Sequence, residues 1–211
     1  MGRVFLTLTS TSTLTSTLTS TLTLILEDLM KIKFGTDGFR GYIGKDFTFE
    51  SALKVADMAL SYFNKNNTNQ VSIGYDTRFL SKEVAQEIAE RAKLYGYKVY
   101  LSDSFIPSPA LSLYVHKKRQ NFGFMITASH NPPQFNGVKI KENFGGSALS
   151  STIEAIAKCK TSLKKQSNGL LKSENIKEFY IDYLRKFFPF ETLSNRSTKV
   201  LVNPMYGAGQ G

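Results

Sequence analysis

The sequence predicts an α/β protein, with a three-layer α/β/α sandwich domain on a mixed sheet and the start of a second, similar domain. The first observation is that short β-rich runs alternate along the chain with longer segments whose apolar residues recur at helical spacing. The second is that polar, glycine-containing loops follow several of these runs. Because α/β domains present reactive residues where strands end, the functional site is expected in those loops.

The first predicted helix covers residues 49–63, where apolar side chains recur at helical spacing. Residues 71–75 form a β-rich run, V-S-I-G-Y, which predicts a short strand. Ser81 is the predicted N-cap of the next helix, because it precedes apolar residues at helical spacing, and Gly96 ends that helix. Another β-rich run predicts a strand at residues 98–101.

The second half continues the alternation with a helix predicted at residues 107–115. A nearly continuous apolar run predicts a strand at residues 122–127, and a shorter strand is expected at 136–140. Helical spacing returns at residues 150–163 and 175–188. Residues 166–173 are predicted to be a polar linker, and residues 199–202 the first strand of a second unit that begins near residue 190.

The beginning of the chain differs from the rest. Every residue from 6 to 24 is Leu, Thr or Ser, and S-T-L-T repeats with a period of four from 12 to 22. Such low complexity offers no varied side chains for a core, so we interpret residues 1–29 as a disordered or spurious extension. A targeting peptide is the alternative, but it requires an uninterrupted apolar region. We therefore expect the functional protein to start at Met30.

Composition narrows the class of partner. Hydrophobic residues make up 41% of the 211 residues, enough for a packed core. The single cysteine excludes a disulfide framework and a multi-cysteine zinc site. The net charge of +10 suits an anionic partner. Basic clusters at 117–119 and 164–165 lack interleaved aromatics, which weakens the case for nucleic acid, and no apolar run is long enough to span a membrane.

The first motif is a glycine-rich segment at residues 35–41, which contains Arg40. Its three glycines allow sharp turns and a close approach to a ligand, and the planar guanidinium of Arg40 suits phosphate. The ordinary interpretation is a simple glycine turn, and the segment lacks the Lys-Ser/Thr ending of a P-loop.

The second motif, T-A-S-H-N-P-P at residues 127–133, follows the predicted apolar strand. It delivers Ser129, His130 and Asn131 at the end of that strand, and Ser129 is a candidate nucleophile or phosphoryl carrier. A protease-type Ser129–His130 pair is disfavoured, because consecutive residues rarely direct their side chains at each other. A serine-rich turn without function is the alternative.

Two further motifs are weaker on their own. In N-G-V-K-I-K, Lys139 alternates with Val138 and Ile140 and so faces opposite to them, either toward solvent or toward the site. A lysine beside phosphate supplies charge and proton transfer. The glycine run at residues 207–211 suggests a nucleotide-binding turn, but the sequence holds nothing that confirms it.

In this order and spacing, the motifs closely resemble those of the α-D-phosphohexomutase superfamily, and most of all its phosphoglucomutase/phosphomannomutase branch. The resemblance runs from about Met30 to the last residue. It is carried by F-G-T-D-G-F-R-G at 34–41, G-Y-D-T-R at 74–78, P-S-P-A at 107–110, T-A-S-H-N-P-P at 127–133, N-G-V-K-I-K at 136–141 and V-N-P-M-Y-G-A-G at 202–209.

The resemblance implies an isomerase, an intramolecular phosphotransferase that moves phosphate between C1 and C6 of a hexose through a hexose bisphosphate. It implies that Ser129 is the phosphoserine, and that its phosphate is one ligand of Mg²⁺. Lys139 and Arg40 would assist with protons and charge. His130 would act with them at the phosphoserine loop. Asn131 and Arg78 would bind substrate. A glucose 1,6-bisphosphate-type activator and a cytoplasmic location are also implied; the oligomeric state is left open.

The resemblance covers only the first domain, taken as residues 30–165, a linker and connecting helix at 166–189, and the start of a second domain at 190–211. The aspartate-rich loop that completes the metal site in the family does not match any segment. We therefore expect a mutase fragment that is inactive or nearly so by itself. The alternatives are a phosphoglucosamine mutase, a non-catalytic phosphosugar-binding remnant and, outside this family, a basic nucleic-acid-binding module.

Overall fold

The structure is a computed structural model, and it describes residues 32–64, 69–161, 164–166, 168–191, 197 and 199–210. The extension expected at residues 1–29, and the start expected at Met30, lie outside the described residues. The domain boundaries expected at residues 165 and 190 stay predictions.

A six-stranded mixed sheet forms the centre of the fold, with the strand order β1-β5-β4-β2-β3-β6. Strands β4, β2, β3 and β6 run parallel to one another, whereas β5 is antiparallel to both β4 and β1. The mixed sheet confirms the predicted fold class. The strands are β1 (Gly38–Tyr42), β2 (Gln70–Tyr75), β3 (Lys98–Ser102), β4 (Phe122–Ile126), β5 (Phe135–Glu142) and β6 (Leu170–Glu174).

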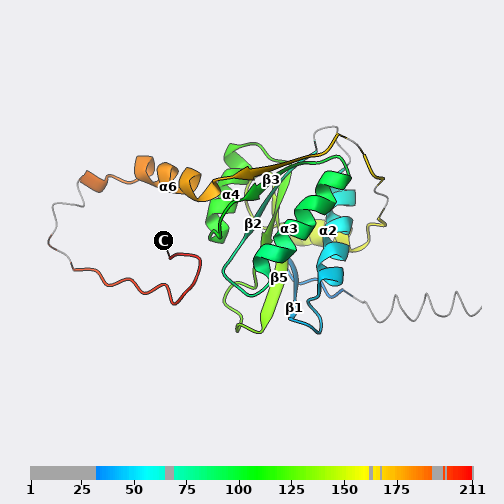
Figure 1. Cartoon of the computed structure of the whole chain (residues 1–211), viewed down its shortest axis with the longest axis horizontal. Helices are drawn as coiled ribbons and strands as arrows, with labels where there is room; N and C mark the ends of the chain where they lie inside the picture. The colour runs from blue at the N-terminus through cyan, green and yellow to red at the C-terminus, as the bar shows by residue number, and fades with distance from the viewer. Residues whose placement is uncertain are drawn as a thin grey trace, which may run out of the picture. The chain divides into compact units, whose positions relative to one another are not determined.

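Helices cover both faces of this sheet (Figure 1). Helices α2 and α3 pack on one face and against each other, and α5 packs against α2. Helix α4 packs on the other face beside α6. The three layers therefore match the predicted sandwich. The helices are α2 (Phe49–Phe63), α3 (Ser81–Leu94), α4 (Ser108–Lys117), α5 (Ser150–Ala157) and α6 (Ile176–Phe187).

Strand β4 lies at the centre of the core, and all five of its residues are buried. On the α2 side, the ring of Phe122 stacks on Phe63 with 4.3 Å between the ring centroids. On the α4 side, Met125 belongs to a buried cluster with Leu111 and Val115. Because both faces are covered, β4 holds a fixed position, and the loop that follows it starts from a rigid base.

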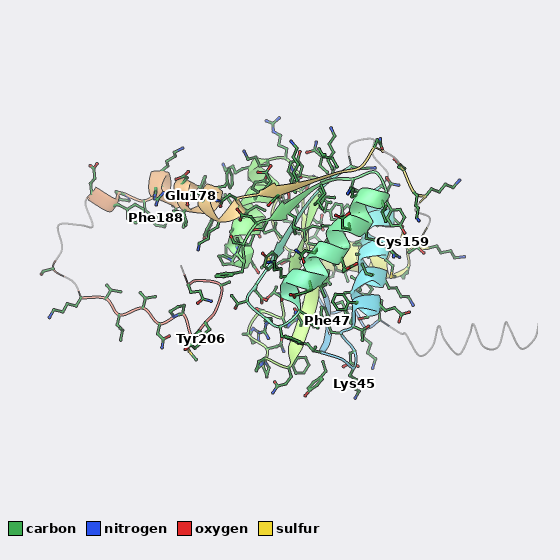
Figure 2. The ribbon with its side chains drawn as sticks, viewed as in Figure 1. Lys45, Phe47, Cys159, Glu178, Phe188 and Tyr206 are labelled. Atoms are coloured by element: carbon green, nitrogen blue, oxygen red, sulfur yellow. The ribbon has the colours of Figure 1, made fainter. Side chains whose placement is uncertain are left out.

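The loop between β1 and α2 closes one end of this core. Phe47, which Figure 2 labels in that loop, is 1% exposed, and its ring stacks on Phe39 of β1. Thr48 then caps α2 by accepting a hydrogen bond from the backbone N–H of Ser51. The capping box is completed by the Ser51 hydroxyl, which accepts from the Thr48 N–H. The predicted helix at residues 49–63 is confirmed.

Two strands were not expected from the sequence. The glycine-rich segment interpreted as a turn contains most of β1, which pairs antiparallel with β5 and places Arg40 opposite Gly137. The polar linker expected at residues 166–173 contains most of β6, which pairs parallel with β3. Strand β6 lies at the sheet edge, where its side chains are mostly exposed, so no apolar alternation marks it.

Three boundaries also differ from expectation. Leu80, in the left-handed conformation with φ 65°, precedes α3, so Ser81 is its first residue rather than its N-cap. Helix α5 ends at Ala157, because the polar residues that follow continue no buried face. Residues 199–202 form no strand: none of the described strands pairs with them, and Leu201 is 96% exposed.

Among the described residues, no helix is both long and apolar enough to cross a bilayer.

The close approach of β5 to its neighbours gives a testable prediction at Gly137. A Cβ at this position would lie 2.5 Å from the carbonyl oxygen of Phe39 and 2.9 Å from that of Thr127. Both neighbours are backbone atoms that cannot move aside, so we expect Gly137→Ala to lower the free energy of unfolding by about 2 kcal/mol. Urea denaturation measures this value.

The control for this variant is Gly35→Ala, because a Cβ there would meet its nearest neighbour, the carbonyl oxygen of Gly38, at an ordinary 3.5 Å. This control should change the free energy of unfolding by less than about 0.5 kcal/mol. Equal effects of the two variants would contradict the assignment of Gly137 as a packing constraint.

Candidate active site

An open pocket of about 1000 Å³ lies where the parallel strands β2, β3 and β4 end. Its walls come from residues 76–79 after β2, residues 106–109 after β3 and residues 127–133 after β4. We call residues 127–133 the Ser129 loop. Residues 205–208 complete the lining. Ligands of α/β domains bind at the carboxyl ends of the strands, so the pocket lies where the fold class places a site.

Ser129 occupies a tight turn directly after β4. Its side chain is exposed, and its backbone is left-handed, with φ 58°. The turn is closed by hydrogen bonds from the Ser129 N–H to Oγ1 of Thr127, at 2.9 Å, and from the Asn131 N–H to the carbonyl of Ala128, at 3.1 Å. A left-handed serine costs about 1–2 kcal/mol, and such strain is concentrated at functional sites.

Arg78 holds this loop through its backbone. One terminal nitrogen, Nη2, donates to the carbonyls of Ser129 at 2.8 Å and Asn131 at 2.6 Å. The other, Nη1, donates to the carbonyls of Pro132 at 2.9 Å and Phe135 at 3.0 Å. One guanidinium therefore binds four carbonyls of the segment that carries the serine. We call this set of contacts the Arg78 clamp.

Asp76 fixes the orientation of the clamp. Its Oδ2 lies 3.3 Å from Nε of Arg78, and its Oδ1 accepts from the Arg78 N–H at 3.0 Å. The same Oδ1 accepts from the hydroxyl of Ser81, a fully buried residue, at 2.7 Å. The five N–H donors of the Arg78 guanidinium are thus directed at the protein itself. The role of Arg78 in binding substrate stays a prediction, and these contacts favour a role in positioning the Ser129 loop.

Asp37 is the second organising carboxylate. Its Oδ2 accepts from Nζ of Lys139 at 2.6 Å, and its Oδ1 lies 3.5 Å from Nη2 of Arg40. Arg40 in turn donates through Nη1 to Oδ1 of Asn131 at 2.9 Å. A chain of polar contacts therefore runs from Lys139 to the Ser129 loop.

The charges around Asp37 determine its protonation. Burial alone would raise the pKa of Asp37, but the hydrogen bond and charge of Lys139 outweigh it. The charges of Arg40 and Lys141 act in the same direction, so the pKa of Asp37 lies below its ordinary value. The network therefore contains an ionised carboxylate at neutral pH.

Lys139 faces opposite to Val138 and Ile140, as the alternation along this strand predicts. Its register neighbours are Gly38 and Met125, whereas Val138 and Ile140 are fully buried on the opposite face. Lys141 lies on the same face as Lys139 and is 8% exposed. Burial and the nearby charge of Lys139 lower the pKa of Lys141, although Asp37 opposes this. Positive charge is thus concentrated on this face.

The structure brings the predicted residues together in two linked groups. Ser129, His130, Asn131 and Arg78 line the pocket. Arg40 and Lys139 are not among the lining residues, and they reach the loop through Asn131. Sequence reasoning missed Asp37 and Asp76, although each stands within three residues of an arginine, which is the one local sign of their roles.

The described residues do not form a metal cage. No group of three or more His, Cys, Asp or Glu side chains gathers among them. Asp37 and Asp76 are already paired with cations. Because Mg²⁺ usually takes carboxylate oxygens as ligands, the described residues do not fit a complete magnesium site. The predicted contact through a phosphate on Ser129 stays a prediction.

Comparison with known proteins gives a consistent result. The family model for phosphoglucomutase/phosphomannomutase, alpha/beta/alpha domain I, matches residues 31–167. Phosphoglucosamine mutase of Prochlorococcus marinus strain MED4 is 32% identical over 185 residues, which are 85% of this chain and 40% of that protein. Phosphoglucomutase of Staphylococcus saprophyticus is 37% identical over 141 residues, which are 65% of this chain and 26% of that protein.

A solved structure agrees with these relatives. The crystal structure of a Thermus thermophilus protein assigned as a phosphomannomutase superposes with a TM-score of 0.72 at 33% identity. The match covers 79% of this chain and 38% of that one. This chain therefore spans two fifths or less of the length of the proteins that it matches.

The Arg78 clamp gives a prediction that does not depend on function. Arg78→Lys replaces the planar guanidinium with an ammonium, which cannot bind four carbonyls at once. The Ser129 loop should therefore become less ordered. We expect faster hydrogen exchange of the amides in residues 128–135 and a loss of about 2 kcal/mol in the free energy of unfolding. Hydrogen exchange measured by mass spectrometry tests the first expectation, and urea denaturation tests the second.

The matched control is Arg91→Lys. Arg91 of α3 binds Asp57 of α2 through Nε at 2.9 Å and Nη2 at 2.5 Å, away from the pocket. This variant should also lose stability, but exchange in residues 128–135 should remain as in the unmodified chain. Equal exchange in that loop for both variants would contradict the clamp.

The lowered pKa of Asp37 predicts a pH dependence. The stability that this carboxylate contributes is present above its ordinary pKa of 3.8 and is lost as the pH falls through its lowered folded value. Asp37→Asn should therefore be less stable by about 2 kcal/mol at neutral pH. Urea denaturation from pH 7 to 3 measures the free energy of unfolding of the unmodified chain and of Asp37→Asn. The difference between these two values should narrow only below pH 3.8.

Asp182→Asn is the control, because Asp182 is an exposed residue of α6 that pairs with Arg185 on the surface. Exposed pairs contribute little, so this variant should change the free energy of unfolding by less than about 0.5 kcal/mol. A difference between Asp37→Asn and the unmodified chain that narrows already near pH 6 would show that the carboxylate is not stabilised as described.

Proposed function

The chain belongs to the phosphoglucomutase/phosphomannomutase family, and on that premise we propose that it supplies the phosphoryl-carrying serine of a phosphohexose mutase. One observation carries the proposal: Ser129 lies exposed on the pocket, in a left-handed turn that the Arg78 clamp fixes. A nucleophile must be held in a defined position before phosphoryl transfer, and the clamp supplies that order.

The proposed step is a transfer from a hexose bisphosphate to Ser129. Oγ of the serine forms a bond to phosphorus while the bond from phosphorus to the sugar oxygen breaks. The serine proton passes to a basic group, and the sugar oxygen gains a proton and leaves as a hydroxyl. In the exchange between C1 and C6, the phosphoserine first transfers its phosphoryl group to the free hydroxyl of a hexose monophosphate. The resulting bisphosphate then reorients and returns its other phosphoryl group to Ser129 by the step above, which leaves the isomeric monophosphate.

The cations near the loop have proposed parts in this step. Lys139 and Arg40 would supply the positive charge that stabilises the phosphoryl oxygens during transfer, and Lys139 would assist with protons. Asp37 already holds the side chains of Lys139 and Arg40 by ion pairs, so they need little reorientation when substrate binds. His130 and Asn131 line the pocket and are proposed to contact the phosphoserine and the substrate.

The remaining assignments are part of the same proposal. Mg²⁺ bound to the serine phosphate, a glucose 1,6-bisphosphate-type activator and a cytoplasmic location are inferred from the family. We propose glucose or mannose phosphate as substrate. Glucosamine phosphate is the second candidate, because the Prochlorococcus marinus relative is named a phosphoglucosamine mutase.

Direct labelling tests the proposed serine. The 211-residue chain, incubated with glucose 1,6-bisphosphate and Mg²⁺, should gain the mass of one phosphate, and peptide mapping should place that phosphate on Ser129. Ser129→Ala should abolish the gain, because the acceptor oxygen is lost. Intact-mass spectrometry follows the reaction as one slow turnover with excess bisphosphate, which does not require the repeated turnover that the isolated chain is expected to lack.

Ser108→Ala is the matched control, since Ser108 also lines the pocket but begins α4 rather than following β4. This variant should still take up phosphate on Ser129. Labelling of Ser108 or of another residue in the folded, unmodified chain, or no labelling at all, would overturn the assignment of Ser129 as the phosphoryl carrier.

A further inference from the structure

The N-G-V-K-I-K motif begins with an asparagine that has no part in the proposed function. Asn136 lies in β5 and is fully buried. Its Oδ1 accepts from the N–H of Gly137 at 2.8 Å. Its Nδ2 donates to the hydroxyl of Ser81 at 2.9 Å and to the carbonyl of Phe79 at 3.0 Å. Backbone groups therefore fix the orientation of this amide, and both of its donors are directed at the entry to α3.

These two donors bind on either side of a strained residue. Leu80 stands between Phe79 and Ser81, and its backbone is left-handed, with φ 65°. This conformation is unfavourable for a leucine, so it persists only where surrounding contacts restrain it. The hydrogen bonds from Asn136 supply such a restraint before and after Leu80. The position of Ser81 is therefore fixed from β5.

The hydrogen bond from Asn136 also determines where the Ser81 hydroxyl donates. A hydroxyl carries a single proton, and Oγ of Ser81 is the acceptor in its contact with Asn136. Its proton is directed at Oδ1 of Asp76, at 2.7 Å. Asp76 in turn contacts Nε of Arg78 at 3.3 Å. Asn136 therefore supports, through two intermediates, the guanidinium of the Arg78 clamp.

This series of contacts returns to β5. Nη1 of Arg78 donates to the carbonyl of Phe135, the residue before Asn136, at 3.0 Å. The polar contacts therefore form a closed ring that begins and ends on neighbouring residues of one strand. Nη2 of Arg78 extends from this ring to the Ser129 loop. The position of Ser129 thus depends on a buried amide in a different strand from the one that it follows.

We propose that Asn136 is a positioning residue for phosphoryl transfer to Ser129, which acts by fixing Asp76 and hence the Arg78 clamp. The inference rests on the proposed function and assigns a part in it to a residue distant from the reacting atoms. Asn136 is fully buried and is not among the residues that line the pocket, so it acts through this ring of contacts rather than on the substrate.

Asn136→Ala tests the proposal, because it removes both donors. Labelling of the full chain by glucose 1,6-bisphosphate and Mg²⁺ should become about tenfold slower at saturating bisphosphate, since displacement of a reacting group slows transfer. The bisphosphate concentration that gives half of the maximal rate should change less than about twofold, because Asn136 does not touch the ligand. Hydrogen exchange in residues 128–135 should become faster.

A second variant, Ser81→Ala, interrupts the same ring and should slow labelling to a similar extent. Because the two residues act in series, the double variant should label no more slowly than the slower single variant. Independent effects would instead multiply to about hundredfold. Circular dichroism establishes that each variant is folded. If Asn136→Ala does not fold, the labelling rate of Ser81→Ala decides, and an unchanged rate overturns the inference.

Asn121→Ala is the matched control. Asn121 lies directly before β4, at the opposite end of that strand from the Ser129 loop, and its Oδ1 accepts from the N–H of Gln70 at 2.9 Å. The control variant also loses a hydrogen bond between an asparagine side chain and the backbone. Its labelling rate should stay within about twofold of that of the unmodified chain, because the site is distant.

The two proposals fail in different ways. If the unmodified chain takes no phosphate on Ser129, the proposed function fails and the inference fails with it. If the unmodified chain is labelled, the proposed function stands and the variants decide. An unchanged labelling rate in folded Asn136→Ala, effects that multiply in the double variant, or equal slowing in Asn121→Ala would then overturn the inference.

Discussion

The interaction on which the site depends is the set of four hydrogen bonds from one guanidinium to the loop that carries Ser129. That loop has no ladder partner after β4 ends, so its carbonyls need another source of donors. A planar group with five donors is the side chain suited to this task, and a lysine would not replace it. The orientation of Arg78 then depends on Asp76, and that of Asp76 on the buried hydroxyl of Ser81.

The free energies involved explain how the strained backbone conformation of Ser129 is maintained without a bound ligand. The left-handed conformation of Ser129 costs about 1–2 kcal/mol. A hydrogen bond to a charged group contributes about 1.5–3 kcal/mol, so even two of the four bonds from Arg78 exceed that cost. The strain is therefore offset by the clamp, and the turn is ordered before substrate binds. Such order before binding is what the proposed phosphoryl transfer would require of its nucleophile.

The sequence alone predicts the elements whose apolar residues recur with a strong period. It does not predict the strands that form only by pairing with a neighbouring strand. The helix at residues 49–63 and the buried strand β4 were predicted, because their apolar patterns are local. Strands β1 and β6 were missed, because glycines in one and exposed polar residues in the other hide strands that form only by pairing. Similarly, Ser129 and Lys139 could be named from motifs, whereas Asp37 and Asp76 could not, since the choice of a counter-ion depends on the folded structure.

The overall charge of +10 has a local counterpart beside the pocket. Asp37 is a single carboxylate that interacts with Lys139, Arg40 and Lys141, so this group keeps a positive excess after pairing. Complete neutralisation would stabilise the fold but would leave less attraction for an anion. Burial, and to a smaller extent the charge of Lys139, lowers the pKa of Lys141, so a further buried cation on this face is unfavourable. Of these cations, Lys139 and Arg40 are connected to the Ser129 loop through Asp37 and Asn131, so they are the ones whose positive excess would attract the phosphorylated ligand of the proposed function.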